Sequence, residues 1–293
     1  MLAVIGTIPT PSMPVTEGPA ALGRGGLSVA GLGIAPGEIS LDRGTPALLG
    51  AACAACGVLG LPAPFAFLVG DEGRGHGSRA LYRHLVDVLP RRSLSTLAFH
   101  YLLPDVMWHD KVLFAVNEMQ PRPRLIADAG FMYAAKMSGQ APAYDLFTPD
   151  AGELAFLADE QAPHPFYTRG FILHDDNRVP DLIRRAYDGD NAAACLLVKG
   201  STDHVADRTG VLSTVDSPNE AAMEAMGGTG DTLTGTVAAL IESGRDVADA
   251  ARIAARVNRL AAKLARPTPA SRISEIIAHI PQALTLALAG EVR

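Results

Sequence analysis

Short apolar runs alternate with longer helical stretches along most of this chain, and this alternation restricts the folds it can adopt. Residues 65–69, 125–130, 144–147 and 194–200 are apolar runs of strand length. Strands that alternate with helices are typical of a mostly parallel sheet with helices on both faces. The sequence therefore predicts an α/β fold, with helices at 47–59, 79–89, 179–187, 233–243, 247–264 and 273–280.

The length and composition suit a single folded unit. The chain has 293 residues, and its hydrophobic content of 48% is enough for a sizeable core. Residues 1–44 are rich in glycine and proline, so we predict an irregular N-terminal segment there. Residues 159–178 combine polar, proline and aromatic residues and are expected to form a lid or an insertion. We predict one domain that spans residues 1–293.

Charge and cysteine content restrict the partners and the compartment. The net charge is −6 and there is no basic run, which argues against nucleic acid as a partner. No apolar segment reaches the roughly 18 residues of a membrane span, and the start lacks the basic region of a signal peptide. Three cysteines, an odd number, point to a reducing compartment. We therefore predict a soluble, cytoplasmic protein, in which Cys53 and Cys56 are buried structural thiols among alanines and leucines.

One glycine-rich stretch carries the strongest signal for chemistry. Residues 227–235 read GGTGDTLTG and precede an apolar helical run. Glycines let the backbone approach a ligand, and the first N–H groups of a helix bind anions. Asp231 is out of place beside such an anion site. It is either a general base, placed to take a proton from a hydroxyl that attacks a phosphate, or only an N-cap of the helix.

A second glycine-rich turn has a similar arrangement. Residues 70–78 follow the predicted strand 65–69 and precede the predicted helix 79–89. A strand, a glycine-rich turn and a helix can hold a phosphate or an acidic substrate, with Ser78 as the N-cap and His76 or Arg79 reaching the anion. The alternative is a surface loop with ordinary helix capping.

Charged residues follow several of the predicted strands, where ligands of open α/β sheets bind. Asp128 ends one apolar run, and Lys199 ends another beside Gly200. Asp150 and Glu153 lie three residues apart across a helix start. They can hold Mg²⁺ through water, or they can simply favour the helix dipole. His100 and His109 are not spaced as metal ligands on one element, and we predict structural roles for both.

Five segments in this order resemble the ribokinase-like superfamily, within it the carbohydrate-kinase-like branch that includes ADP/ATP-dependent NAD(P)H-hydrate dehydratase. They are LIADAG at 125–130, LFTPDAGEL at 146–154, LLVKGSTDHV at 196–205, GGTGDTLTG at 227–235 and RISEIIAHIPQAL at 272–284. The sequence departs from the family pattern before the glycine-rich stretch, where Asn219-Glu220-Ala221 replaces Asn-Pro-Gly.

The resemblance implies a three-layer α/β/α sandwich with a mostly parallel sheet. It also implies Asp231 as the catalytic base and the backbone of residues 228–230 as an anion hole. ATP or ADP and Mg²⁺ are the implied cofactors, and a homo-oligomer is possible. The remaining implied site residues are Gly227, Gly228, Thr229, Gly230, Lys199 and Gly200 for the nucleotide, Asp128, Asp150 and Glu153 for the substrate, and Glu153 for the metal through water.

Three functions remain open at this point. The first is a nucleotide-dependent NAD(P)H-hydrate dehydratase or a close relative, which phosphorylates a hydroxyl and then eliminates phosphate. The second is a small-molecule kinase for a sugar or a vitamin precursor, with the same base and anion hole. The third, in another class, is a nucleotide-binding protein without catalysis.

Overall fold

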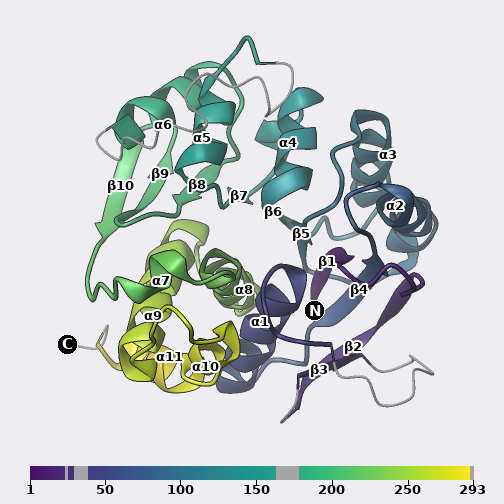
Figure 1. The fold of residues 1–293 in the computed structure, drawn as a ribbon. Coiled ribbons are helices and arrows are strands. Elements are labelled where there is room, and N and C mark those ends of the chain that lie inside the picture. Colours follow the sequence, from purple (N-terminus) through teal and green to yellow (C-terminus); the bar gives the residue numbers. More distant parts are fainter. Residues whose placement is uncertain (24–25, 30–38, 163–177, 291–293) are drawn as a thin grey trace.

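The structure is a computed structural model that describes residues 1–23, 26–29, 39–162 and 178–290. Its strands form one sheet in the order β10-β9-β8-β7-β6-β5-β1-β4-β2-β3 (Figure 1). The strands from β8 to β4 in this order are parallel to one another, and the pairs at either end of the sheet are antiparallel. Their bounds are β1 Leu2–Ile8, β2 Thr16–Leu22, β3 Leu27–Val29, β4 Phe65–Gly70, β5 Thr96–His100, β6 Arg124–Ala127, β7 Leu146–Phe147, β8 Cys195–Val198, β9 Asp203–Asp207 and β10 Gly210–Val215.

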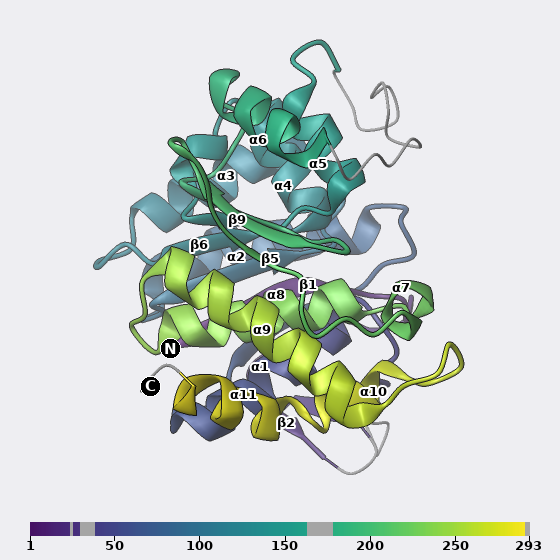
Figure 2. The ribbon, with the colours of Figure 1, turned by 90° about the vertical axis from the view of Figure 1, so that its left-hand side faces the viewer.

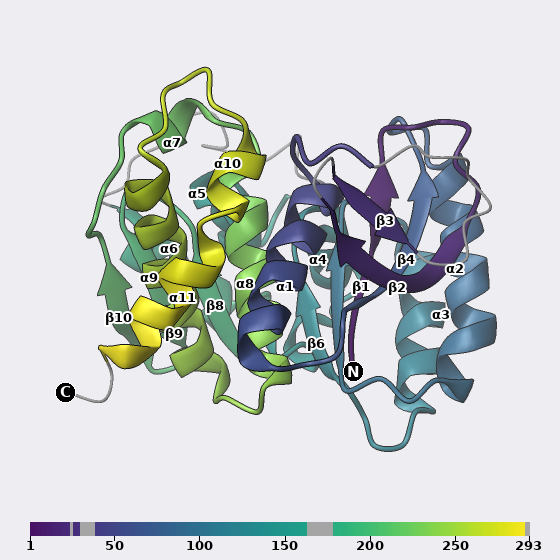
Figure 3. The ribbon, with the colours of Figure 1, turned by 90° about the horizontal axis from the view of Figure 1, so that it is seen from below.

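Helices cover both faces of this sheet, so the predicted three-layer α/β/α fold is confirmed (Figures 2 and 3). One layer holds α1 Thr45–Leu59, α8 Thr229–Glu242, α9 Val247–Ala265, α10 Ile273–Ile277 and α11 Ile280–Ala289, with the short α7 Ala222–Ala225 beside it. The other holds α2 His76–Val88, α3 Val106–Asn117, α4 Ala129–Met137, α5 Ala151–Ala158 and α6 Val179–Asp188. The 3₁₀ turns are η1 Leu89–Arg91 and η2 Ala141–Ala143.

Strand β1 divides the core between the two layers. Leu2 and Val4 pack into the layer of α1 and α8, whereas Ala3 and Ile5 pack into the layer of α2 to α6. All seven residues of β1 are buried. This is the expected pattern for a central strand with helices on both faces.

The prediction of an irregular segment over residues 1–44 is wrong, because this segment contains β1, β2 and β3. Strand β1 lies between β5 and β4 and pairs with both in parallel. A strand buried on both faces lacks the alternation of apolar and polar residues that reveals an edge strand. The glycines and prolines that surround β1 hid the short apolar run.

Helices α6, α9 and α10 begin at the predicted residues, whereas α1, α2 and α8 begin two to four residues earlier than predicted. Helix α1 begins at Thr45 with Gly44 as its N-cap, and α2 begins at His76 with Gly75 as its N-cap. Ser78, the predicted N-cap, therefore lies inside α2. The helix predicted over 273–280 is α10, and α11 follows it. Most of the predicted lid or insertion at 159–178 lies outside the described residues.

None of the helices in the described ranges is long and apolar enough to cross a membrane.

Helices α1 and α8 cross at very short distance, and Gly235 of α8 makes this possible. A Cβ atom at Gly235 would lie 2.0 Å from the carbonyl oxygen of Leu48 in α1. Gly235 is the last residue of the GGTGDTLTG stretch, and its role is helix packing. Because Gly44, the N-cap of α1, contacts the first turn of α8, this crossing also positions the functional site described below.

We expect Gly235→Ala to destabilise the protein by about 2 kcal/mol or more, because the added methyl group collides with backbone that cannot rotate away. The matched control is Gly57→Ala in the exposed part of α1, where an added Cβ meets nothing within 4 Å. This control should raise the free energy of unfolding by about 0.5–1 kcal/mol, since alanine favours helix. Equal effects of the two substitutions in urea denaturation would contradict the close packing of α1 against α8.

Candidate active site

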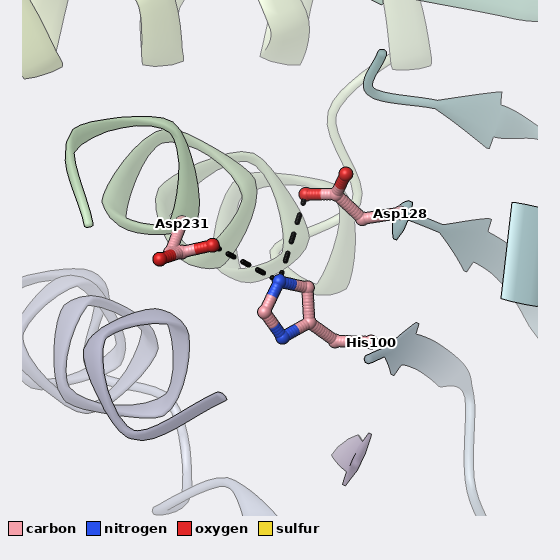
Figure 4. Close-up of side chains that lie close together, drawn as sticks. All are labelled: His100, Asp128 and Asp231. Carbon is pink, nitrogen blue, oxygen red and sulfur yellow. Dashed lines mark hydrogen bonds and ion pairs between the residues drawn. The ribbon is translucent and has the colours of Figure 1, made fainter. Parts of the chain in front are cut away.

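The carboxyl ends of three parallel strands meet the N-terminal turn of α8. His100 is the last residue of β5, Asp128 follows β6, and Lys199 follows β8. Asp231 lies in the first turn of α8. Figure 4 shows His100, Asp128 and Asp231 pointing toward one another from these separate elements. Charged side chains therefore converge at the carboxyl ends of the parallel strands, where ligands of α/β proteins bind.

Asp231 is buried and held through both carboxylate oxygens. The Gly44 N–H donates to Oδ2 at 2.6 Å, and His100 Nε2 lies 3.0 Å from Oδ1. Burial alone would raise the pKa of Asp231, but the hydrogen bond and charge of His100, the Lys199 charge and the Gly44 N–H outweigh it. The pKa therefore lies below its usual value, and Asp231 is an ionised carboxylate at neutral pH. Such a group can accept a proton from a substrate.

Lys199 and Asp128 form an ion pair beside Asp231. The Lys199 ammonium lies 3.0 Å from both oxygens of Asp128. Asp128 also accepts hydrogen bonds from the Ala129 N–H at 2.8 Å and the Thr234 hydroxyl at 2.7 Å. Burial lowers the pKa of Lys199, but the negative charges of Asp128 and Asp231 raise it above its usual value. Lys199 therefore stays charged, and in this structure Asp128 anchors it.

Lys199 also contacts the glycine-rich turn. A Cβ atom at Gly230 would lie 3.2 Å from Lys199 Cδ and 3.5 Å from its Nζ. Gly228 is the N-cap of α8 with φ 98, a left-handed conformation that favours glycine. The first N–H groups of an α-helix have no partner within the helix. A lysine ammonium and the start of α8 therefore lie together, which is the arrangement expected for a phosphate group.

Gly227 and Gly228 lie against Arg43, which precedes α1. A Cβ atom at Gly227 would be 3.4 Å from Arg43 Cδ, and one at Gly228 would be 3.3 Å from Arg43 Cα. Gly200, by contrast, uses its N–H to donate to Asp203 Oδ1 at 3.1 Å. Arg259 binds the same Asp203 at 2.8 Å and the Gly200 carbonyl oxygen at 3.0 Å. Gly200 thus belongs to a loop that Arg259 fixes in place.

Asp150 and Glu153 form a capping box at the start of α5, so the simpler of the two interpretations describes their local structure. Asp150 Oδ1 accepts from the Glu153 N–H at 2.8 Å, and Glu153 Oε2 accepts from the Asp150 N–H at 2.9 Å. Glu153 Oε1 accepts from the Tyr133 hydroxyl at 2.8 Å. Burial, helped by the charges of Asp128 and Asp150 and opposed by Lys199, raises the pKa of Glu153 to about 8.

The environment of Glu153 makes it a poorer candidate for a metal ligand than Asp150. Glu153 is mostly protonated at neutral pH and both of its oxygens are engaged, whereas a Mg²⁺ ligand must be ionised. Asp150 is exposed and is the better placed acid of the pair. Ligand atoms of His100, Asp128 and Asp231 lie within 4.8 Å of one another. Because the Lys199 ammonium already contacts Asp128, this cluster contains its own cation.

Of the two interpretations of the glycine-rich turn at 70–78, the structure favours a loop whose backbone N–H groups are already occupied. The Asp71 carboxylate accepts hydrogen bonds from the backbone N–H groups of Gly73 at 3.1 Å, Arg74 at 3.0 Å, Gly75 at 3.0 Å and Ser78 at 2.8 Å. The Ser78 hydroxyl also donates to it at 2.8 Å. The anion in this turn is therefore the protein's own carboxylate. The simpler alternative, a loop with ordinary capping, holds.

The prediction of a structural role is confirmed for His109 and incomplete for His100. His109 is buried against Phe131 and Tyr144, and its Nε2 lies 2.8 Å from the Tyr144 hydroxyl. His100 lies at the centre of the site between Asp231 and Thr45. A weak signal was available, because His100 directly follows the apolar residues 97–99, much as Asp128 and Lys199 follow apolar runs.

The predicted structural thiols Cys53 and Cys56 are free, and burial raises the pKa of each to about 12. Neither is a thiolate at neutral pH, which excludes them as nucleophiles there.

Similarity to known proteins identifies the family of this chain. The family model described as NAD(P)H-hydrate dehydratase matches residues 103–281. An uncharacterised protein of Methanocaldococcus jannaschii is 40% identical over 216 residues, which are 73% of this chain and 88% of that protein. The chain belongs to the carbohydrate-kinase-like family that this model describes, and it adopts the ribokinase-like fold. The family is one of enzymes.

Two further relatives carry a functional name. The bifunctional NAD(P)H-hydrate repair enzyme of Pyrobaculum aerophilum is 30% identical over 141 residues, which are 47% of this chain but only 25% of that enzyme. The structure of the ADP/ATP-dependent NAD(P)H-hydrate dehydratase of Bacillus subtilis, crystallised with ATP and Mg²⁺, has a TM-score of 0.55 at 15% identity. The alignment covers 82% of this chain and 84% of that one, and it shows a common fold.

The raised pKa of Glu153 predicts a specific dependence of stability on pH. The native state keeps the Glu153 proton up to about pH 8, whereas the unfolded chain loses it near the ordinary value of 4.5. The native state therefore binds more protons between these values, and the free energy of unfolding falls as pH rises through this window. Glu153→Gln, which cannot ionise, should reduce this fall by about 1 kcal/mol or more in denaturant titrations from pH 5 to 8.5.

The matched control is Glu275→Gln in the exposed capping box of α10, where Glu275 accepts from the Arg272 N–H at 2.7 Å. It should leave the pH dependence unchanged. A Glu153→Gln variant with the pH dependence of the wild type would show that Glu153 is already ionised in the native state.

Proposed function

We propose that this protein is a nucleotide-dependent enzyme that phosphorylates a hydroxyl group, as an NAD(P)H-hydrate dehydratase or a close relative. The observation that carries the proposal is the buried, ionised carboxylate of Asp231, which lies at the start of α8 beside the Lys199 ammonium. Phosphoryl transfer to a hydroxyl requires a base for its proton and positive charge for the phosphate. Asp231 would be the base, and Lys199 and the first N–H groups of α8 would supply the positive charge. The named relatives support the choice of substrate class.

The residues present fit a nucleotide polyphosphate. Residues 227, 228 and 230 are glycines, so three positions at the start of α8 carry no side chain, and Lys199 lies along Gly230. In the proposed complex, the N–H groups of residues 228–230 bind phosphate oxygens and Lys199 neutralises their charge. Mg²⁺ bound to the phosphates would supply further charge neutralisation, and the exposed Asp150 is the acid best placed to hold it through water. Gly227 and Thr229 are the neighbouring residues of the same turn.

In the proposed reaction, Asp231 takes the proton of the substrate hydroxyl while the oxygen of that hydroxyl attacks the terminal phosphorus of the nucleotide. The bond from that phosphorus to the bridging oxygen breaks, and the shortened nucleotide leaves. Gly44 and His100 hold the Asp231 carboxylate in one orientation during this step. In a dehydratase, the new phosphate ester then loses phosphate and a proton from the neighbouring carbon, which restores the ring double bond.

A small-molecule kinase would use the same base and the same anion site, but its phosphate ester would remain as the product. The two functions are separated by incubating the protein with a nucleotide and Mg²⁺, either with NAD(P)H hydrate or with a panel of alcohols. Recovery of NAD(P)H together with nucleotide consumption supports the dehydratase. A stable phosphate ester indicates a kinase. Nucleotide binding without turnover of any substrate would contradict the proposal and indicate a non-catalytic binding protein.

The role of Asp231 is tested by Asp231→Asn, which keeps the shape of the side chain and removes its basicity. We expect kcat to fall by about 100-fold or more, because general-base catalysis contributes about that much, while the nucleotide Kd changes only a few-fold. The matched control is Asp246→Asn at the N-cap of α9, where asparagine caps as well as aspartate. Turnover of Asp231→Asn close to that of this control would contradict the assignment of Asp231 as the base.

A further inference from the structure

His100 lies between two carboxylates and has no access to solvent. Only 1% of its surface is exposed. Its Nε2 is 3.0 Å from Asp231 Oδ1 and 4.0 Å from Asp128 Oδ2, and its Nδ1 is 3.0 Å from the Thr45 hydroxyl. We propose that His100 is a positioning residue that orients the Asp231 carboxylate through an Nε2–H hydrogen bond and keeps it ionised. The proposal rests on the function proposed above for Asp231.

The partners of the His100 ring decide which nitrogen must carry a proton. An ionised carboxylate can only accept hydrogen bonds, so the His100 nitrogen that faces Asp231 must carry a proton. A hydroxyl can donate or accept, so the Thr45 hydroxyl can pair with Nδ1 whether or not that nitrogen carries a proton. A continuous chain of hydrogen bonds therefore runs from Thr45 through His100 to Asp231.

The backbone around His100 is built to hold this arrangement. A Cβ atom at Gly6 in β1 would lie 2.5 Å from both the Thr45 hydroxyl oxygen and the His100 carbonyl oxygen. Glycine at this position therefore leaves room for the contact between α1 and β5. Tyr101 packs its ring against the His100 ring, with the centroids 4.2 Å apart, and has a left-handed backbone with φ 50. The Thr7 hydroxyl donates to the Tyr101 carbonyl oxygen at 2.7 Å.

The charges around Asp231 explain why this donor matters. Asp231 faces His100 from β5, Lys199 after β8, Asp128 after β6 and the Gly44 N–H before α1, with Glu153 of α5 nearby. The Lys199 ammonium is engaged with both oxygens of Asp128, so His100 is the side chain that donates directly to Asp231. Without that donor, burial and the negative charge of Asp128 would favour the protonated, inactive form of Asp231.

The first test needs no substrate, so it separates failure of this inference from failure of the proposed function. In ¹⁵N-labelled protein at neutral pH, the long-range ¹⁵N–¹H spectrum of the His100 ring reports which nitrogen carries the proton. We expect a proton on Nε2. A proton on Nδ1 alone would overturn the inference, because His100 could then not donate to Asp231.

The second test uses the pH dependence of kcat/KM, whose acid limb reports the base of the free enzyme. In His100→Gln, the amide nitrogen lies as many bonds from Cα as Nε2 does and can still donate to Asp231. In His100→Leu, the donor is absent. We expect His100→Leu to shift the acid limb upward by about one pH unit, because burial is no longer opposed by a donor. We also expect kcat/KM at neutral pH to fall by about tenfold, because the Asp231 carboxylate is no longer held in one orientation. His100→Gln should keep the acid limb close to that of the wild type.

The matched control is His109→Gln, which changes a buried histidine outside the site. It should lower thermal stability without moving the acid limb. A purely structural role of His100 would reduce activity at all pH values and leave the acid limb in place. An unshifted acid limb in His100→Leu would therefore overturn the inference even if activity fell.

Discussion

The contact between the Lys199 ammonium and the Asp128 carboxylate is the interaction on which the site depends. Three acids, Asp128, Glu153 and Asp231, converge where strands β6 to β8 end, and the charges of the ionised Asp128 and Asp231 repel one another. Lys199 reaches both oxygens of Asp128 and lies along Gly230. Removing one partner of a buried ion pair typically costs about 3–5 kcal/mol, because the other charge is left uncompensated. The pair thus allows an ionised Asp231 to exist beside Asp128.

The fold places these groups through two close contacts, one between helices α1 and α8 and one between α1 and the sheet. Gly235 allows α8 to lie directly against α1, and Gly6 allows Thr45 to reach His100. Consequently, the N–H of Gly44 points at Asp231 from the start of one helix while the first turn of α8 stays open. Substituting either glycine would push apart the elements that carry the site. These two glycines therefore affect the site although neither is part of it.

Much of the architecture could be predicted from the sequence, because strand and helix periods are local signals. Asp128, Lys199 and Asp231 could be found for the same reason, since each ends a strand or begins a helix. Strand β1 could not, because it is buried on both faces and surrounded by glycine and proline. The role of His100 could not be derived either, since its partner Asp231 lies 131 residues away in the chain. Such a contact is a property of the packed layers and leaves no local pattern.

The two glycine-rich turns look alike in sequence, but the carboxylate in each turn has different hydrogen-bond partners. In the turn at 70–78, the Asp71 carboxylate accepts the backbone N–H groups, whereas Asp231 points away from the start of its own helix toward Gly44 and His100. We propose that, of these two turns, only the one at 227–231 binds phosphate. The proposal can be tested by titrating ¹⁵N-labelled protein with a non-hydrolysable ATP analogue and Mg²⁺. We expect large amide shifts at residues 228–230 and none at residues 73–78, and the reverse pattern would contradict the proposal.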